Sequence, residues 1–237
     1  MQYSDYNCLR LELDAGVAFV SIHHPPINLL DEVLSQEFDR LGRELETDAS
    51  VRVVVVQSAL PDFFIAHSGL GRVGAAPKVV SATPSFRLTQ MIGERFRNMP
   101  KVTIAKVEGR ARGGGSEIAL AMDMCFAALG KAIFGQPELA ERYGYINRAL
   151  PVAELTPFVE KLARRIASFP AHTVAHAKAA VDRGAFGSLA EGLLVEAHES
   201  DLSVASEVTQ ARVREALQVG AETYEGELEM DFLSRLT

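Results

Sequence analysis

The stretch that decides the fold is residues 107–123, which read VEGRARGGGSEIALAMD, with three consecutive glycines at Gly113, Gly114 and Gly115. A β-rich run precedes the glycines and an apolar run follows them, so the stretch predicts a strand, a tight turn and a helix. Glycines at such a junction let the backbone approach a ligand closely, and the free N–H groups at the start of a helix can stabilise an oxyanion. Glu117, one turn into the helix, would face the same place.

The same residues have a simpler interpretation. The three glycines can serve only a tight crossing from strand to helix, and Glu117 can be a first-turn carboxylate that interacts with the helix dipole. The stretch by itself leaves both interpretations open.

Two further stretches carry groups suited to chemistry. Residues 134–138, FGQPE, end a predicted strand and supply a second carboxylate, Glu138. Two carboxylates can share one water, one removing its proton while the other delivers a proton to carbon. Residues 62–69, DFFIAHSG, enter a long loop after a buried strand and can present one more backbone N–H. Taken singly, the first is typical of a helix start and the second of an ordinary loop.

Strands and helices alternate through residues 1–150, which predicts an α/β body. A hairpin is expected at residues 9–22, further strands at 51–56, 102–105, 125–128 and 132–134, and helices at 31–47, 86–98 and after the glycines through Met124. Beyond Pro151 the pattern becomes helical, with helices expected at 155–169, 171–183 and 206–219. We therefore expect a core at residues 1–150 and a helical C-terminal region at residues 151–237, packed directly on each other.

Composition narrows the class of protein. The chain has 237 residues, 48% of them apolar and with a net charge of −7, which excludes intrinsic disorder. No apolar run reaches the ~20 residues of a membrane helix, and the first residues have no basic or apolar signal region. Cys8 and Cys125 have neither pairing nor metal-ligand spacing, so we expect a reducing compartment, a cytoplasmic location and no metal.

The charge is unevenly distributed along the chain. Residues 186–237 hold eleven acidic side chains and three arginines, while the rest of the chain is close to neutral. Nothing resembles the basic stripe of a duplex-binding surface, so we expect no nucleic-acid partner.

Three other motifs resemble known sites but lack parts that those sites need. Residues 69–74, GLGRVG, fit a dinucleotide pattern, but Pro77 and Pro84 prevent the helix that should follow. His172 and His176 have helical spacing but no third metal ligand, so we expect them to be solvent-facing or capping. The segment around Ser116 lacks the second glycine of a nucleophile elbow, which disfavours a serine hydrolase.

In this order, the three stretches resemble the enoyl-CoA hydratase/isomerase family, also called the crotonase superfamily. The resemblance extends to the hairpin, to PPINLL at residues 25–30 and to YINRALP at residues 145–151. It implies a fold of repeated ββα turns wound into a spiral, with a C-terminal helical region used for oligomerisation. It also implies a homotrimer or hexamer.

The resemblance also implies a site. In that family two backbone N–H groups hold the thioester oxygen of an acyl-CoA as it becomes an enolate. The likeness places these oxyanion-hole donors at Ser68 and Gly114, and the two catalytic glutamates at Glu117 and Glu138. Substrate-binding contacts would fall on Ala66, His67, Leu70 and Gly113.

The implied activity is a lyase reaction in fatty acid metabolism, the hydration of an enoyl-CoA. Glu117 would act as base on a water and Glu138 as acid at the α carbon, with no cofactor other than the coenzyme A of the substrate. Two alternatives remain: a double-bond isomerase in which one glutamate moves the proton, and a non-catalytic crotonase-fold assembly or binding protein. The acidic tail favours the last. So does the lack of a segment of a few dozen residues that the family usually has after its second glutamate.

Overall fold

The computed structural model describes residues 3–69, 87–134, 144 and 146–218. The chain forms two compact units that divide between Ser168 and Phe169. The first unit is an α/β body and the second is helical.

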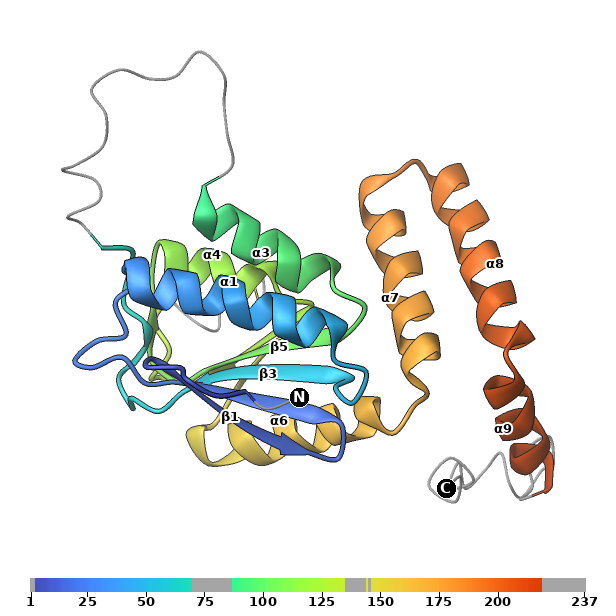
Figure 1. The fold of residues 1–237 in the computed structure, drawn as a ribbon, viewed down its shortest axis with the longest axis horizontal. Coiled ribbons are helices and arrows are strands. Elements are labelled where there is room, and N and C mark those ends of the chain that lie inside the picture. Colours follow the sequence, from blue (N-terminus) through green and yellow to red (C-terminus); the bar gives the residue numbers. More distant parts are fainter. Residues whose placement is uncertain (1–2, 70–86, 135–143, 145, 219–237) are drawn as a thin grey trace, which may run out of the picture. The chain divides into compact units, whose positions relative to one another are not determined.

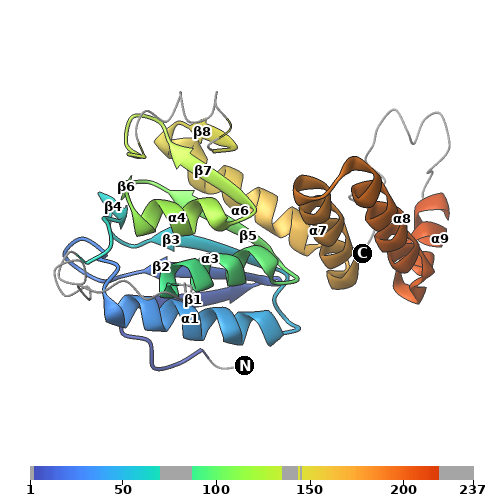
Figure 2. The ribbon, with the colours of Figure 1, turned by 90° about the horizontal axis from the view of Figure 1, so that it is seen from above.

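The first unit is built on a six-stranded sheet with the order β1-β2-β3-β5-β7-β8 (Figures 1 and 2). β1 (Leu9–Asp14) and β2 (Val17–Ile22) form the predicted antiparallel hairpin. The remaining strands all run parallel to their neighbours; they are β3 (Val53–Ser58), β5 (Val102–Val107), β7 (Met124–Ala128) and β8 (Arg148–Leu150). A second, two-stranded parallel sheet pairs β4 (Phe63–Ile65) with β6 (Arg110–Ala111).

Helices cover both faces of the large sheet, as Figures 1 and 2 show. One face carries α1 (Glu32–Thr47), α3 (Leu88–Asn98) and α4 (Gly114–Ala121), and the other carries α6 (Val152–Ala167). Alternate residues of one strand point to the two sides: Val54 and Val56 join the core under the first set, and Val53 and Val55 the core under α6. Strands buried on both faces explain the unbroken apolar run of β3.

This architecture confirms the predicted α/β fold with ββα turns, and its helix starts follow from local chemistry. Asp31 caps α1 by accepting a hydrogen bond from the Leu34 N–H at 3.0 Å, as an N-cap aspartate should. At residues 132–134 the predicted strand is reduced to one bridge between Ile133 and Arg110.

The boundary between the two units lies later than the predicted boundary after Leu150. The reason is that α6 buries Leu155, Val159, Ala163 and Ala167 against the sheet, so it belongs to the α/β body.

The second unit consists of α7 (Ala171–Phe186), α8 (Leu189–Ala205) and α9 (Glu207–Gln218). α8 was not predicted, and a capping box between Ser188 and Glu191 starts it. His172 and His176 are not solvent-facing: His176 Nδ1 lies 2.6 Å from a carboxylate oxygen of Glu199 on α8. His172 Nε2 lies 2.6 Å from the Ser206 hydroxyl, so both half-buried rings join α7 to the helices that follow it.

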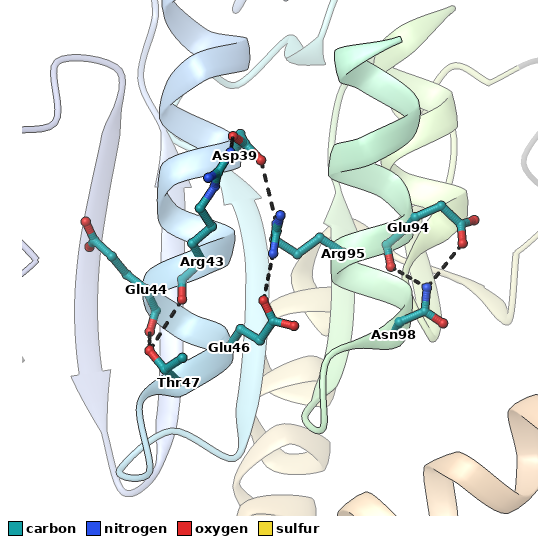
Figure 3. Close-up of polar contacts among 8 residues, drawn as sticks. All are labelled: Asp39, Arg43, Glu44, Glu46, Thr47, Glu94, Arg95 and Asn98. Carbon is teal, nitrogen blue, oxygen red and sulfur yellow. Dashed lines mark hydrogen bonds and ion pairs between the residues drawn. The ribbon is translucent and has the colours of Figure 1, made fainter. Parts of the chain in front are cut away.

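Ion pairs hold α3 against α1 (Figure 3). They fix the position of α3, which also lines the candidate site. Arg95 of α3 donates to a Glu46 carboxylate oxygen at 2.7 Å and lies 3.6 Å from Asp39, which also pairs with Arg43. A Cβ at Gly42 would lie 2.6 Å from the Arg95 side chain, so the glycine leaves room for this arginine between the helices.

A buried carboxylate at the end of α1 predicts sensitivity to acid. Asp48 accepts hydrogen bonds from the Ser50 hydroxyl at 2.6 Å and from the Tyr3 hydroxyl at 2.7 Å. These bonds, from Ser50 first and Tyr3 second, lower the pKa of Asp48 to about 2, although burial opposes the shift. Because the folded state holds this carboxylate ionised, its contribution is present above the unfolded pKa near 4 and is lost as the pH falls towards 2.

We therefore expect the free energy of unfolding of the wild type to fall by about 2 kcal/mol more than that of Asp48→Asn between pH 5 and pH 2. Urea unfolding at a series of pH values measures the difference. Glu12→Gln, an exposed change on β1, is the control and should follow the wild type. Parallel curves for wild type and Asp48→Asn would show that this carboxylate does not set the acid sensitivity.

Candidate active site

The segment that carries Ser68 is held in place by the chain before α1. The Leu30 N–H donates to the His67 carbonyl at 3.0 Å, and the Leu30 carbonyl accepts from the Gly69 N–H at 3.1 Å. These two hydrogen bonds form a parallel bridge between Leu30 and Ser68. In such a bridge the N–H of Ser68 points away from Leu30. The backbone donor predicted at Ser68 is therefore available on the other side of the segment.

Asn28 anchors this arrangement, a role that was not predicted from the sequence. It is fully buried, and its Nδ2 donates to the Ser58 hydroxyl at 2.8 Å and to the Phe64 carbonyl at 3.0 Å. Its backbone has a φ of 50°, a left-handed conformation that asparagine tolerates better than most residues. The only feature of the sequence that could have indicated this role is the position of Asn28 shortly after two prolines and directly before two leucines.

The glycine turn before α4 brings Gly114 against the Ser68 segment. Gly113 has a φ of 51°, which favours glycine, and starts the turn. A Cβ at Gly114 would lie 2.4 Å from the Ser68 hydroxyl oxygen, so the two predicted donor residues are neighbours. A Cβ at Gly115 would lie 2.5 Å from the Ile65 carbonyl oxygen, so this glycine is needed for close packing of α4 on β4.

The N–H of Gly114 opens α4, where the first N–H groups of a helix have no partner within the helix. Among the described residues it donates to none, while Gly115 and Glu117 donate to Arg112 and Gly113. The N–H groups of Ser68 and Gly114, neither of which donates to a described residue, thus come from segments that touch. An oxyanion hole needs two backbone donors of this kind.

The His67 side chain is oriented by its own neighbour. Its Nδ1 lies 2.8 Å from the Ser68 carbonyl oxygen, and since a carbonyl only accepts, Nδ1 carries the hydrogen. In the neutral ring this leaves Nε2 as an acceptor. Ala66, the residue before it, is buried and its N–H donates to the Ile27 carbonyl at 3.2 Å.

Ser68 and Glu117 line one cavity of about 470 Å³. The remaining described lining residues come from α3, from the residue that precedes it and from the end of α4; they are Arg87, Thr89, Gln90, Gly93, Glu94 and Ala121. Glu117 is exposed, so its carboxylate can reach a ligand and exchange protons with water.

The structure therefore brings together Ser68, Gly114 and Glu117. Gly113 and His67 are close as well, because a Cβ at Gly113 would lie 4.0 Å from that of His67. Glu138, Leu70 and the shortened segment after Glu138 lie outside the described residues.

The described residues show neither a metal-ligand cluster nor a membrane-spanning helix. Within the described ranges, no three His, Cys, Asp or Glu side chains gather as metal ligands. None of the described helices combines the length and the hydrophobicity of a membrane-spanning segment.

The family model for enoyl-CoA hydratase/isomerase matches residues 12–141. That is more than half of the chain and includes the three stretches from which the site was predicted. The chain belongs to the enoyl-CoA hydratase/isomerase family.

Individual relatives agree with this assignment. A Bacillus subtilis protein named "Probable enoyl-CoA hydratase" is 32% identical over 133 residues, which are 56% of this chain and 51%, about half, of that protein. The Short-chain-enoyl-CoA hydratase of Clostridium acetobutylicum is 26% identical over 218 residues, covering 76% of this chain and 83% of its own length.

Solved structures share the fold. A Streptomyces avermitilis structure with a provisional enoyl-CoA hydratase name is 32% identical, covers 98% of both chains and has a TM-score of 0.68. A Geobacillus kaustophilus structure reaches a TM-score of 0.80 at 22% identity and covers 91% of this chain and 95% of its own, a likeness of fold alone.

Proposed function

We propose that the protein is an enoyl-CoA hydratase, which adds water across the α,β double bond of an acyl-CoA thioester. The observation that carries the proposal is the placement of the Ser68 and Gly114 N–H groups, which donate to no described residue, beside the cavity that Glu117 lines. The names of the relatives point to the same chemistry.

The proposed reaction proceeds with Glu117 as the base. Its carboxylate removes a proton from a water, the water oxygen bonds to the β carbon, and the electron pair of the double bond moves to the thioester oxygen. Each backbone donor at this developing enolate would be worth about 3–4 kcal/mol. A proton from Glu138 then adds at the α carbon as the electron pair returns from the oxygen. Return of the proton held by Glu117 to Glu138 restores both carboxyl groups, so one water is consumed and no electrons are gained or lost.

Because no oxidation occurs, we propose no cofactor beyond the coenzyme A of the substrate and no resident metal. A cytoplasmic location and a role in fatty acid metabolism stay predictions from the sequence.

A screen of enoyl-CoA esters, monitored by the loss of the absorbance of the conjugated thioester, tests the proposal. We expect saturable hydration of at least one short ester. Migration of the double bond without hydration would instead indicate an isomerase. Binding of the esters without any turnover would indicate a non-catalytic binding protein.

We further propose that the protein assembles as a homotrimer or hexamer through its C-terminal helices. The support is a set of exposed apolar side chains on these helices, among them Val181, Leu193, Leu194 and Val204. Val181, Leu193 and Val204 also line an apolar cavity of about 590 Å³ between α7 and α8.

The expected result in sedimentation velocity at micromolar concentration is a species of three or six chains of 25.7 kDa. Leu194→Glu, at a side chain that is 73% exposed, should shift the protein towards smaller species because it places a charge in the apolar surface. Lys161→Glu on α6 is the control for a change in charge. A wild type that sediments only as a monomer would contradict the proposed assembly.

A further inference from the structure

The described residues that line the cavity beside Glu117 are mostly polar and include one cation. Apart from Gly93 and Ala121, every described residue of the lining carries a polar or charged side chain. An aliphatic acyl chain would gain little free energy of binding there. Polar side chains offer it few apolar contacts, and they would lose their bound water when the chain covers them. The lining therefore favours a short acyl group with a polar end.

Arg87 is the basic residue of this lining, and its charge is not neutralised within the described chain. Its guanidinium makes no ion pair or hydrogen bond with a described residue, while its backbone N–H donates to the Gln90 side chain at 2.9 Å. The other carboxylate of the lining besides Glu117 is Glu94. It is already bonded to Asn98 at 3.1 Å and to Arg97 at 3.4 Å.

A guanidinium offers paired N–H donors that match the two oxygens of a carboxylate or a phosphate. Arg87 shares its cavity with Ser68 and Glu117, where the reacting thioester would lie. The phosphates of coenzyme A are separated from the thioester by the whole pantetheine arm, whereas the far end of a short acyl group is a few bonds away. The acyl end is therefore the better source of the anion.

We propose that the acyl group carries a carboxylate and that Arg87 binds it. This inference rests on the proposed hydration of an enoyl-CoA. It specifies the substrate class as a short enoyl-CoA with a carboxylate at the end of the acyl chain.

The test compares two esters of the same shape. 4-Carboxybut-2-enoyl-CoA carries the carboxylate, and 5-methylhex-2-enoyl-CoA replaces it with an isopropyl group of similar size. We expect the wild type to hydrate the carboxylated ester with the higher kcat/KM. Arg87→Gln should lower that value about 10- to 100-fold, mostly through KM, and leave the neutral ester nearly unchanged.

Two further variants sharpen the result. Arg87→Lys should recover part of the loss, because it restores the charge without the paired donors. Arg10→Gln, at an exposed arginine of β1 outside the cavity, should behave as the wild type with both esters. Arg87 is itself exposed, so thermal unfolding should confirm that its variants remain folded.

Phosphate-free N-acetylcysteamine thioesters of the two acyl groups separate the possible anions. If Arg87 binds the acyl carboxylate, the loss in Arg87→Gln persists with the carboxylated thioester. An equal loss with both CoA esters that disappears with both phosphate-free thioesters would assign Arg87 to a phosphate and overturn the inference. Equal hydration of both CoA esters by wild type and Arg87→Gln would overturn it too, while leaving the proposed hydratase activity intact. Absence of hydration of any enoyl-CoA would instead remove the proposed function itself.

Discussion

Glu117→Gln is expected to lower kcat for the best enoyl-CoA ester by about 10²- to 10⁴-fold, because an amide of the same shape cannot take the proton of the attacking water. Glu117 is exposed and lies in the first turn of α4, so the fold should tolerate the change. The loss should therefore appear in turnover, with the melting temperature close to that of the wild type. The loss of absorbance of the conjugated thioester measures turnover, and thermal unfolding of the same preparation measures the melting temperature.

The matched control is Glu154→Gln. Glu154 is an exposed glutamate in the first turn of α6, so its substitution removes the same interaction with a helix N-terminus without touching the cavity. We expect it to leave turnover unchanged. Glu138→Gln extends the series: a hydratase with two carboxylates should lose comparable activity in both variants, whereas an isomerase should lose activity unequally. Near wild-type turnover in Glu117→Gln would disprove the assignment of this residue as the base.

The α/β body was predictable because its signals are local. Asp31 caps the first helix, the alternation at residues 9–13 gives the hairpin, and the glycines at 113–115 mark the junction into α4. In each case neighbouring residues determine the conformation, so reading along the chain was sufficient.

The elements that were missed depend on distant partners or lack a clear period. β4 and β6 are three and two residues long and exist because Phe63 pairs with Arg110, 47 positions later, a pairing that no local pattern reveals. α8 has exposed apolar residues at 193, 194, 202 and 204, which do not form a single helical stripe. Without a stripe, the periodicity that identified the other helices was absent.

The residues of the candidate site also fall into those that the sequence indicated and those that it did not. The glycine motif made Gly114 and Glu117 candidates, and the resemblance added Ser68. Arg87 carried no motif: it reaches the cavity because α3 packs closely on α4, where a Cβ at Gly93 would lie 3.1 Å from that of Ala121. Tertiary packing, which a sequence pattern does not encode, selects such residues.

Gly114→Ala is expected to lower kcat/KM by about 10²- to 10³-fold, the effect of losing one well-placed oxyanion donor. The backbone of Gly114 lies outside the left-handed region, so alanine brings no conformational strain there. The effect would come from space alone: the new Cβ would lie 2.4 Å from the Ser68 hydroxyl oxygen and 2.7 Å from Cδ2 of Leu30. The two donor segments must then move apart, so the two N–H groups could no longer both point at the thioester oxygen.

A double variant tests whether contact with Ser68 is the cause. Ser68→Ala alone should stay near wild-type activity, because it keeps the backbone N–H and removes only the hydroxyl. In Ser68→Ala/Gly114→Ala the closest obstacle is gone and the remaining one is the end of a flexible leucine, so activity should partly return. Gly184→Ala in α7, where a Cβ meets nothing within 4 Å, controls for the loss of a glycine. Full activity in Gly114→Ala, or a double variant no better than Gly114→Ala at equal stability, would show that the spacing of these two segments does not govern the reaction.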